Sequence, residues 1–193
     1  RVAAEDVQRT IALFFKPGEV FEVRLLDAVP GSGWNKPRTF VGYFRGSDAD
    51  LVVRELTTFK AWRGVYFTIN PINTAMYARC AARFRDSKTS ATDADVVQRR
   101  RILIDLDPVR ISGISSSGVE HDAAMERANQ VRKQLVEEKG WPEPMIANSG
   151  NGAHLIFSVC LPNEIDLVER VLRALDSSFS DAQVSIDTSV HNP

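Results

Sequence analysis

The stretch RILIDLDPVR, residues 101–110, places two carboxylates inside an otherwise apolar run. A run of this composition, bounded by charged and turn-forming residues, is typical of a β-strand. Side chains two positions apart on a strand point to the same face, so Asp105 and Asp107 are expected to project together while Leu106 packs behind them. Two ionised carboxylates this close repel each other unless a cation or a proton lies between them. The pair therefore favours a divalent-metal site, although Asp-x-Asp at a strand end also fits two turn-capping residues.

The residues around this strand predict a small α/β layer. After it comes a long helical pattern closed by glycine, then two strands joined by a glycine-rich turn, then a second helical pattern and a last strand. The predicted strands are 100–108, 143–150, 153–161 and 182–187, and the predicted helices are 118–140 and 163–179. This order predicts an RRM-like antiparallel sheet with both helices on one face.

The first half of the chain predicts a separate α/β module. The helices are expected at 3–15 and 47–62, the strands at 19–28, 38–46 and 64–71, and a long polar loop ending in a short helix at 84–98. The fold class is therefore α/β in the α+β sense, with submodules 1–90 and 91–193 that form one catalytic core, 1–193. Because the chain opens on Arg1 and stops on Pro193, we expect it to be part of a longer protein.

Composition excludes several classes of protein. The chain has 193 residues, 44% of them hydrophobic, and a net charge of −1, which is ordinary for a globular protein and unlike a histone-like binder. No apolar run approaches the roughly 20 residues of a membrane span, and no signal-peptide pattern is present. Cys80 and Cys160 are isolated, so neither a zinc site nor a disulfide is expected, and we expect a cytoplasmic protein of a bacterial cell or a phage-infected host.

Two more motifs end in polar clusters. ANSGNGAHLIF, residues 147–157, contains the tight turn Ser149-Gly150-Asn151-Gly152 followed by His154, which suits a phosphate ligand or a plain hairpin with a packed histidine. VSIDTSVHNP, residues 184–193, places Asp187 at the end of an apolar strand, where it is either a third carboxylate ligand or a turn residue. Three neighbouring strands that all end in polar clusters favour a shared site.

The order of these motifs resembles the archaeo-eukaryotic primase superfamily, the primase-polymerases. Its three motifs match Asp105/Asp107, the segment Ser149 to His154, and Ile186-Asp187. DLDP and SGNGAHL are also similar to the polymerase domain of bacterial end-joining ligases, except that the lysine of their second motif is absent here. TTFKAWRGVYFTINPIN, TDADVVQRRRILIDLDPVRISGISS and IDTSVHNP look closer to the primase-polymerases of phages, plasmids and CRISPR-associated loci. The resemblance covers the chain from about residue 40 onward.

The resemblance implies template-directed nucleotidyl transfer with the active site in the cleft between the two submodules. Asp105, Asp107 and Asp187 would hold two Mg²⁺ or Mn²⁺ ions, and Ser149, Gly150, Asn151 and His154 would contact the incoming (d)NTP. His154 would donate a hydrogen bond to a phosphate oxygen rather than act as a nucleophile. The implied partners are single-stranded DNA template and primer, with a fused or separate helicase or CRISPR-associated proteins, and no membrane.

Weaker expectations concern residues beside the motifs. Arg110 follows DLDP and is expected to reach a phosphate, and Asn192 lies where end-joining domains have polar nucleotide contacts. Lys88 and the run Arg99 to Arg101 either contact the nucleic-acid backbone or are solvent-facing charges. Tyr66 and Phe67 alternate on a predicted strand, so that one faces the core and the other is free to stack on a base.

Three functions other than a polymerase are alternatives for this motif pattern. A haloacid-dehalogenase-type phosphohydrolase also uses Asp-x-Asp, but it has threonine soon after the second Asp, where this chain has Pro108-Val109. A DNA-nicking replication protein needs a His-x-His pair, whereas the three histidines here are far apart in sequence. A catalytically silent palm-like module that binds nucleic acid is the third, and its binding would survive chelation of metal ions.

Overall fold

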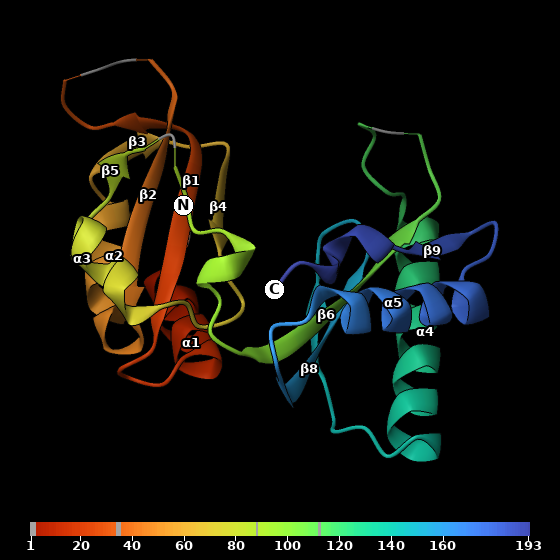
Figure 1. Cartoon of the computed structure of the whole chain (residues 1–193). Helices are drawn as coiled ribbons and strands as arrows, with labels where there is room; N and C mark the ends of the chain where they lie inside the picture. The colour runs from red at the N-terminus through yellow and green to blue at the C-terminus, as the bar shows by residue number, and fades with distance from the viewer. Residues whose placement is uncertain (1–2, 34–35, 88, 112) are drawn as a thin grey trace. The chain divides into compact units, whose positions relative to one another are not determined.

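A computed structural model of the chain describes residues 3–33, 36–87, 89–111 and 113–193 (Figure 1). The chain divides into two compact units, Arg1–Gln98 and Arg99–Pro193. Lys88, one of the residues expected near nucleic acid, lies outside the described residues. Over the described ranges, none of the helices combines the length and the apolarity that crossing a bilayer demands.

The N-terminal unit is built on a five-stranded antiparallel sheet. The strands follow the order β3-β1-β2-β5, and β4 also pairs with β1. The strands are β1 Val20–Pro30, β2 Arg38–Arg45, β3 Phe59–Ala61, β4 Gly64–Phe67 and β5 Arg85–Asp86. The helices are α1 Ala4–Phe14, α2 Ala49–Leu56 and α3 Tyr77–Cys80, with 3₁₀ turns η1 Gly46–Asp48, η2 Thr74–Met76 and η3 Asp93–Asp95.

Aromatic packing covers one face of this sheet. The ring of Phe15, at the end of α1, stacks on Phe21 of β1 with centroids 4.3 Å apart, and Phe14 meets Phe67 of β4 edge-on at 5.1 Å. These contacts bury the strand positions that alternate with the polar ones, as the period of two requires. On the other face Val41 and Tyr43 of β2 pack with residues of the 72–96 segment, namely Ile72, Met76, Cys80 and Val96.

The predicted helix 47–62 is wrong in its second half. The helix α2 ends at Leu56, and residues 59–61 form β3, which pairs with β1. The hydroxyls of Thr57 and Thr58 donate hydrogen bonds to the carbonyls of Arg54 and Glu55, at 2.6 and 2.7 Å. These bonds stop the helix, because β-branched residues with side chains turned back onto the last helical turn favour its end. The short helix α3 and the strand β5 were not predicted.

The C-terminal unit has the predicted architecture. Its strands are β6 Arg99–Pro108, β7 Met145–Asn148, β8 Ala153–Leu161 and β9 Val184–Ile186, in the antiparallel order β7-β8-β6-β9. Its helices are α4 Gly118–Lys133, continued by the π-helical turn η4 Gln134–Glu138, and α5 Ile165–Phe179, and a 3₁₀ turn η5 Thr188–His191 follows β9. The predicted α+β class is confirmed, and so is the order strand, helix, hairpin, helix, strand.

Both long helices of this unit pack on one face of its sheet. Ile104 and Leu106 of β6 and Leu155 of β8 are buried in one cluster with Ala128 of α4 and Leu172 of α5. Because strand side chains alternate between faces, the residues between these apolar positions project from the face opposite the helices. Asp105 and Asp107 are among them.

Candidate metal and nucleotide site

The sheet of the C-terminal unit lines up three polar residues in one row across three strands. In the β6–β8 ladder Asp105 of β6 lies directly opposite His154 of β8. In the β6–β9 ladder Leu106 lies opposite Ile186, and the next backbone bond, from the Asp187 N–H to the Asp105 carbonyl, is 2.9 Å long. Directly paired residues on neighbouring strands share a face. His154, Asp105 and Asp187 therefore lie side by side on the face opposite the helices.

A second row lies one step along the same face. Asp107 is opposite Ser185 of β9. On the other side, the β6–β8 register continued by one residue past Leu106 and Ala153 places Asp107 opposite Gly152. A side chain at Gly152 would collide with β6, because a Cβ built there would lie 2.1 Å from the Leu106 carbonyl oxygen and 3.0 Å from Asp107 Oδ1. The glycine thus lets the turn approach β6 and the Asp107 carboxylate. The close approach of this backbone to a ligand stays a prediction.

The surroundings of the two rows change the pKa of one carboxylate, that of Asp107. Burial raises the pKa of Asp107 above its ordinary value, and the neighbouring carboxylates of Asp105 and Asp187 raise it further. Arg110 and His154 oppose this shift in the pKa. An ionised Asp107 is therefore disfavoured by its surroundings, which is the condition that a bound cation relieves.

His154 forms an ion pair with the central carboxylate. Its Nε2 lies 3.3 Å from Asp105 Oδ1, with 31% of the histidine side chain and 18% of the aspartate side chain exposed. The contact with Asp105 raises the pKa of His154, against the opposing effect of its burial. The contact is long and not well aligned as a hydrogen bond, so within the described ranges the buried Oδ1 of Asp105 has no hydrogen-bond partner.

We expect this ion pair to make stability depend on pH. Because the folded pKa of His154 is raised, the stabilisation is complete below the unfolded value and is lost as pH rises through the folded value. In metal-free buffer, His154→Gln should lower the free energy of unfolding by about 1 kcal/mol or less at pH 5.5, because the pair is partly solvated. Urea denaturation at pH 5.5 and pH 9 should show the difference shrinking at the higher pH. In an Asp105→Asn background most of the pH dependence of that difference should vanish; its persistence would contradict the pairing.

The turn before His154 is bonded mainly to itself. The Ser149 Oγ accepts the Gly152 N–H at 2.8 Å, and the Asn148 side chain accepts the Gly150 N–H at 2.7 Å. Gly150 has φ +90°, which glycine adopts without steric cost. The backbone N–H groups of Gly150 and Gly152 are therefore engaged within the turn rather than offered to a phosphate.

Asn151 and Arg110 both connect to the loop after β6. Asn151 Oδ1 accepts the Ser116 N–H at 3.1 Å, so the side chain fastens the turn to the start of α4 and keeps only its amide hydrogens for a ligand. Arg110 bonds through Nη1 to the Ile114 carbonyl and lies close enough to Asp107 to lower its pKa. Arg110 thus lies near Asp107, and the contact of Arg110 and Asn151 with a phosphate stays a prediction.

The segment after Asp187 is held by contacts that the sequence did not reveal. Asp187 Oδ1 accepts the Ser189 N–H at 2.7 Å, and the His191 ring bonds to the Thr188 carbonyl at 2.8 Å. Arg99, expected at nucleic-acid backbone, is 1% exposed and donates from Nη2 to the His191 carbonyl at 2.7 Å. Arg99 is therefore a positioning residue for the third motif. Asn192 is exposed just beyond η5.

The three aspartates offer the type of ligand that divalent metal ions bind. Their oxygens are the hard donors that Mg²⁺ and Mn²⁺ prefer, and the buried Asp105 Oδ1 is an oxygen without a directed donor. In the described part of the chain, no group of three or more His, Cys, Asp or Glu side chains is arranged to hold a metal ion. Asp187 Oδ1 is engaged by the Ser189 N–H, and Asp105 Oδ1 faces the His154 ring without a hydrogen bond. The donor set fits such ions, and rotation of these side chains would be needed to converge on them.

Sequence reasoning missed two residues that position this site. Arg99 stood out only as the first residue of a basic run, and no sequence pattern singled out Ser116. Their partners, His191 and Asn151, are far away in sequence, so no local pattern could have identified the contacts. No family model matches the chain, and neither does any curated protein or solved structure.

Proposed function

We propose that this chain is a template-directed primase-polymerase, which transfers a nucleotidyl group from a (d)NTP to a 3′-hydroxyl. One observation carries the proposal: Asp105, Asp107 and Asp187 come from two neighbouring strands onto one sheet face, with His154 in the same row. A cluster of carboxylates on an open sheet face is costly in a protein that does not use it, because like charges repel.

The three aspartates would hold two divalent ions, Mg²⁺ or Mn²⁺. When bound, such ions lower the pKa of an attacking hydroxyl and neutralise the charge of a triphosphate and its leaving group. Asp105 and Asp187 are adjacent across a ladder and Asp107 is one step along β6, so after side-chain rotation their oxygens would surround the same ions. Rotation of Asp187 away from Ser189 would release the oxygen that the ions require.

The neighbouring side chains suit a triphosphate. The raised pKa of His154 favours the charged ring, and because Nε2 faces Asp105, Nδ1 would donate the hydrogen bond to a phosphate oxygen. Arg110 adds a second cation near Asp107, and the Ser149 hydroxyl and the Asn151 amide add neutral donors. Positioning and charge neutralisation supply most of the catalysis in phosphoryl transfer, so no nucleophilic side chain is required.

The proposed substrates are a single-stranded DNA template, a primer and (d)NTPs. A fused or separate helicase, or CRISPR-associated proteins, would supply the template in the cell. The competing function is a palm-like module that binds nucleic acid without turnover. The two differ in their dependence on metal ions, because strand binding through cationic side chains needs no divalent ion whereas nucleotidyl transfer does.

The test is incorporation of labelled nucleotides on primed and unprimed single-stranded templates, with each nucleotide pool and with Mg²⁺ or Mn²⁺ in turn. We expect extension of the primed template and its complete loss in EDTA, with recovery when the metal is restored. Products on the unprimed template would add initiation to the activity. If template binding survives EDTA and no nucleotide is incorporated under any condition, the chain is a binding module and the proposal fails.

A further inference from the structure

The N-terminal unit has its own polar cavity, on the face of its sheet that α1 and α2 leave uncovered. The cavity measures about 810 Å³. It is lined by strand residues and by the segment after β5: Arg24, Leu26, Arg38, Thr39, Val41, Asp86, Ser87, Thr89 and Ser90. Two guanidinium groups and four hydroxyls converge on one space, which is the kind of lining that recognises a phosphate.

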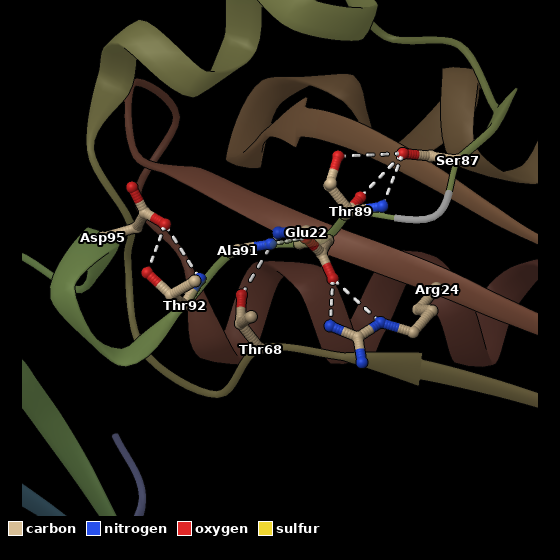
Figure 2. Close-up of polar contacts among 8 residues, drawn as sticks. All are labelled: Glu22, Arg24, Thr68, Ser87, Thr89, Ala91, Thr92 and Asp95. Carbon is tan, nitrogen blue, oxygen red and sulfur yellow. Dashed lines mark hydrogen bonds and ion pairs between the residues drawn. The ribbon is translucent and has the colours of Figure 1, made fainter.

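Arg24 is fixed in this cavity by a buried carboxylate. Its Nε and Nη2 both donate to Glu22 Oε1, at 3.1 and 2.7 Å (Figure 2). The Glu22 side chain is only 2% exposed, while that of Arg24 is 38% exposed. The other oxygen of Glu22 accepts the Ala91 N–H, which ties the segment after β5 to the sheet. A guanidinium held in this way presents its remaining N–H groups at a set position, so less entropy is lost when it binds an anion.

Ser87 and Thr89 also line the cavity, and their hydroxyl oxygens lie 3.3 Å apart. Ser87 Oγ accepts the Thr89 N–H at 3.2 Å and donates to the Thr89 carbonyl at 2.7 Å (Figure 2). Arg38, at the rim, forms an ion pair with Asp86. The Asp86 carboxylate repels phosphate, so we assign the phosphate to the Arg24 side of the cavity and leave Asp86 to orient Arg38 or to accept from a sugar or base.

An exposed aromatic ring lies beside Arg24. Tyr66 of β4 is directly opposite Arg24 of β1, and both line a smaller cavity of about 200 Å³. The tyrosine is 57% exposed. Its ring lies over Gly64, because a Cβ built at that glycine would be 2.5 Å from a ring carbon. The ring edge formed by Cε2, Cζ and the hydroxyl therefore lies against Gly64, and the exposed remainder of the ring is available to stack on a base. Its neighbour Phe67 packs against Phe14, so Tyr66 is the member of the pair that faces away from the core.

From this juxtaposition we infer that the N-terminal unit binds a nucleotide unit of single-stranded nucleic acid, with its phosphate on Arg24 and its base on Tyr66. Tyr66 and Arg24 are directly paired across one ladder and line the same small cavity, which matches the short span between a base and its own phosphate. The site lies wholly within the N-terminal unit and uses no metal ligand. The inference goes beyond the proposed polymerase function and does not depend on it.

The experiment measures binding of a short fluorescein-labelled oligo(dT) to the full chain by anisotropy, in excess EDTA and at several salt concentrations. Tyr66→Ala should weaken binding between about fivefold and a hundredfold, the range for losing one stacked base. Tyr66→Phe keeps the ring and should bind within about twofold of the wild type. Because Tyr66 is exposed, neither change should disturb folding, which circular dichroism would verify.

A second variant reports on the phosphate contact. Arg24→Lys keeps a cation beside Glu22 but loses the planar guanidinium with its fixed set of N–H donors. It should weaken oligonucleotide binding several-fold. The double variant Glu22→Gln/Arg24→Gln removes both charges, and the slope of log affinity against log salt should become shallower by about 0.7, the value for one lost phosphate contact on a single strand. Arg173→Ala, on exposed α5 of the other unit, is the matched control and should leave the slope unchanged.

Competition with free dTMP identifies the source of the nucleotide unit. Displacement of the oligonucleotide by dTMP with an affinity that falls in Tyr66→Ala assigns the site to free nucleotides. Failure of dTMP to compete, with the variant effects intact, assigns it to a strand. If Tyr66→Ala binds oligo(dT) like the wild type and the salt slope of the double variant is unaltered, the inference is overturned. Because EDTA suppresses metal-dependent chemistry, that result would leave the polymerase proposal untouched.

Discussion

Asp107→Asn is expected to abolish nucleotide incorporation and, in the same protein, to leave stability unchanged or raise it. The loss follows because an amide does not replace a carboxylate as a ligand of Mg²⁺ or Mn²⁺. Metal ions contribute several kcal/mol to the transition state, so primer extension should fall by about a thousandfold or more. Single-turnover extension with excess enzyme would measure it.

The gain in stability follows from the raised pKa of Asp107. Burial and the carboxylates of Asp105 and Asp187 favour its protonated form. A carboxyl group with a raised folded pKa destabilises the fold as pH rises above the unfolded value, and this cost grows until pH passes the folded value. Asparagine removes the charge, so urea denaturation at pH 7 in EDTA should show no loss of stability. Added Mn²⁺ should stabilise the wild type, by RT ln(1 + [L]/Kd), and should stabilise the variant less.

The controls separate catalysis from folding. Asp122→Asn removes an aspartate from α4, on the opposite side of the sheet from the carboxylate rows, and should extend primers like the wild type. Asp105→Asn and Asp187→Asn should behave like Asp107→Asn in the extension assay. Full activity in any of the three would remove that residue from the catalytic assignment, and full activity in all of them would refute the two-metal proposal.

The second large effect is expected at Gly152. A methyl group there would lie 2.1 Å from the Leu106 carbonyl oxygen, and main-chain atoms in a paired ladder have little room to retreat. Gly152→Ala should therefore force β8 away from β6 and lower the free energy of unfolding by about 3 kcal/mol. It should also displace His154 and Asp107, so that incorporation falls even at temperatures where the protein stays folded.

Gly118→Ala is the matched control for this substitution. Gly118 begins α4, and a Cβ there meets nothing within 4 Å. Alanine in a helix reduces the entropy of the unfolded chain, so this variant should be as stable as the wild type or slightly more stable. Urea denaturation of both variants under identical conditions provides the comparison. A Gly152→Ala protein as stable as Gly118→Ala would show that the turn does not need its close approach to β6.

Local patterns predicted the elements that carry the site. Alternation along 101–108 placed Asp105 and Asp107 on one face and Leu106 on the other, and the ladders confirm that face assignment. The turn at 149–152 and the two helices of the C-terminal unit were likewise predicted, because periodicity and glycine placement are properties of neighbouring residues. The helix 47–62 was predicted too long, because its apolar spacing continues past the threonines that end it.

What the sequence determined by itself is therefore most of the longer strands and helices and the face on which their side chains lie, since these depend on residues a few positions apart. Only the tertiary structure decided which strands are neighbours: it brought Asp187 beside Asp105, Arg99 to the His191 carbonyl, and Ala91 to Glu22. These pairs are separated by tens of residues. Their meeting depends on strand register and on packing across the whole unit, which no short window of sequence contains.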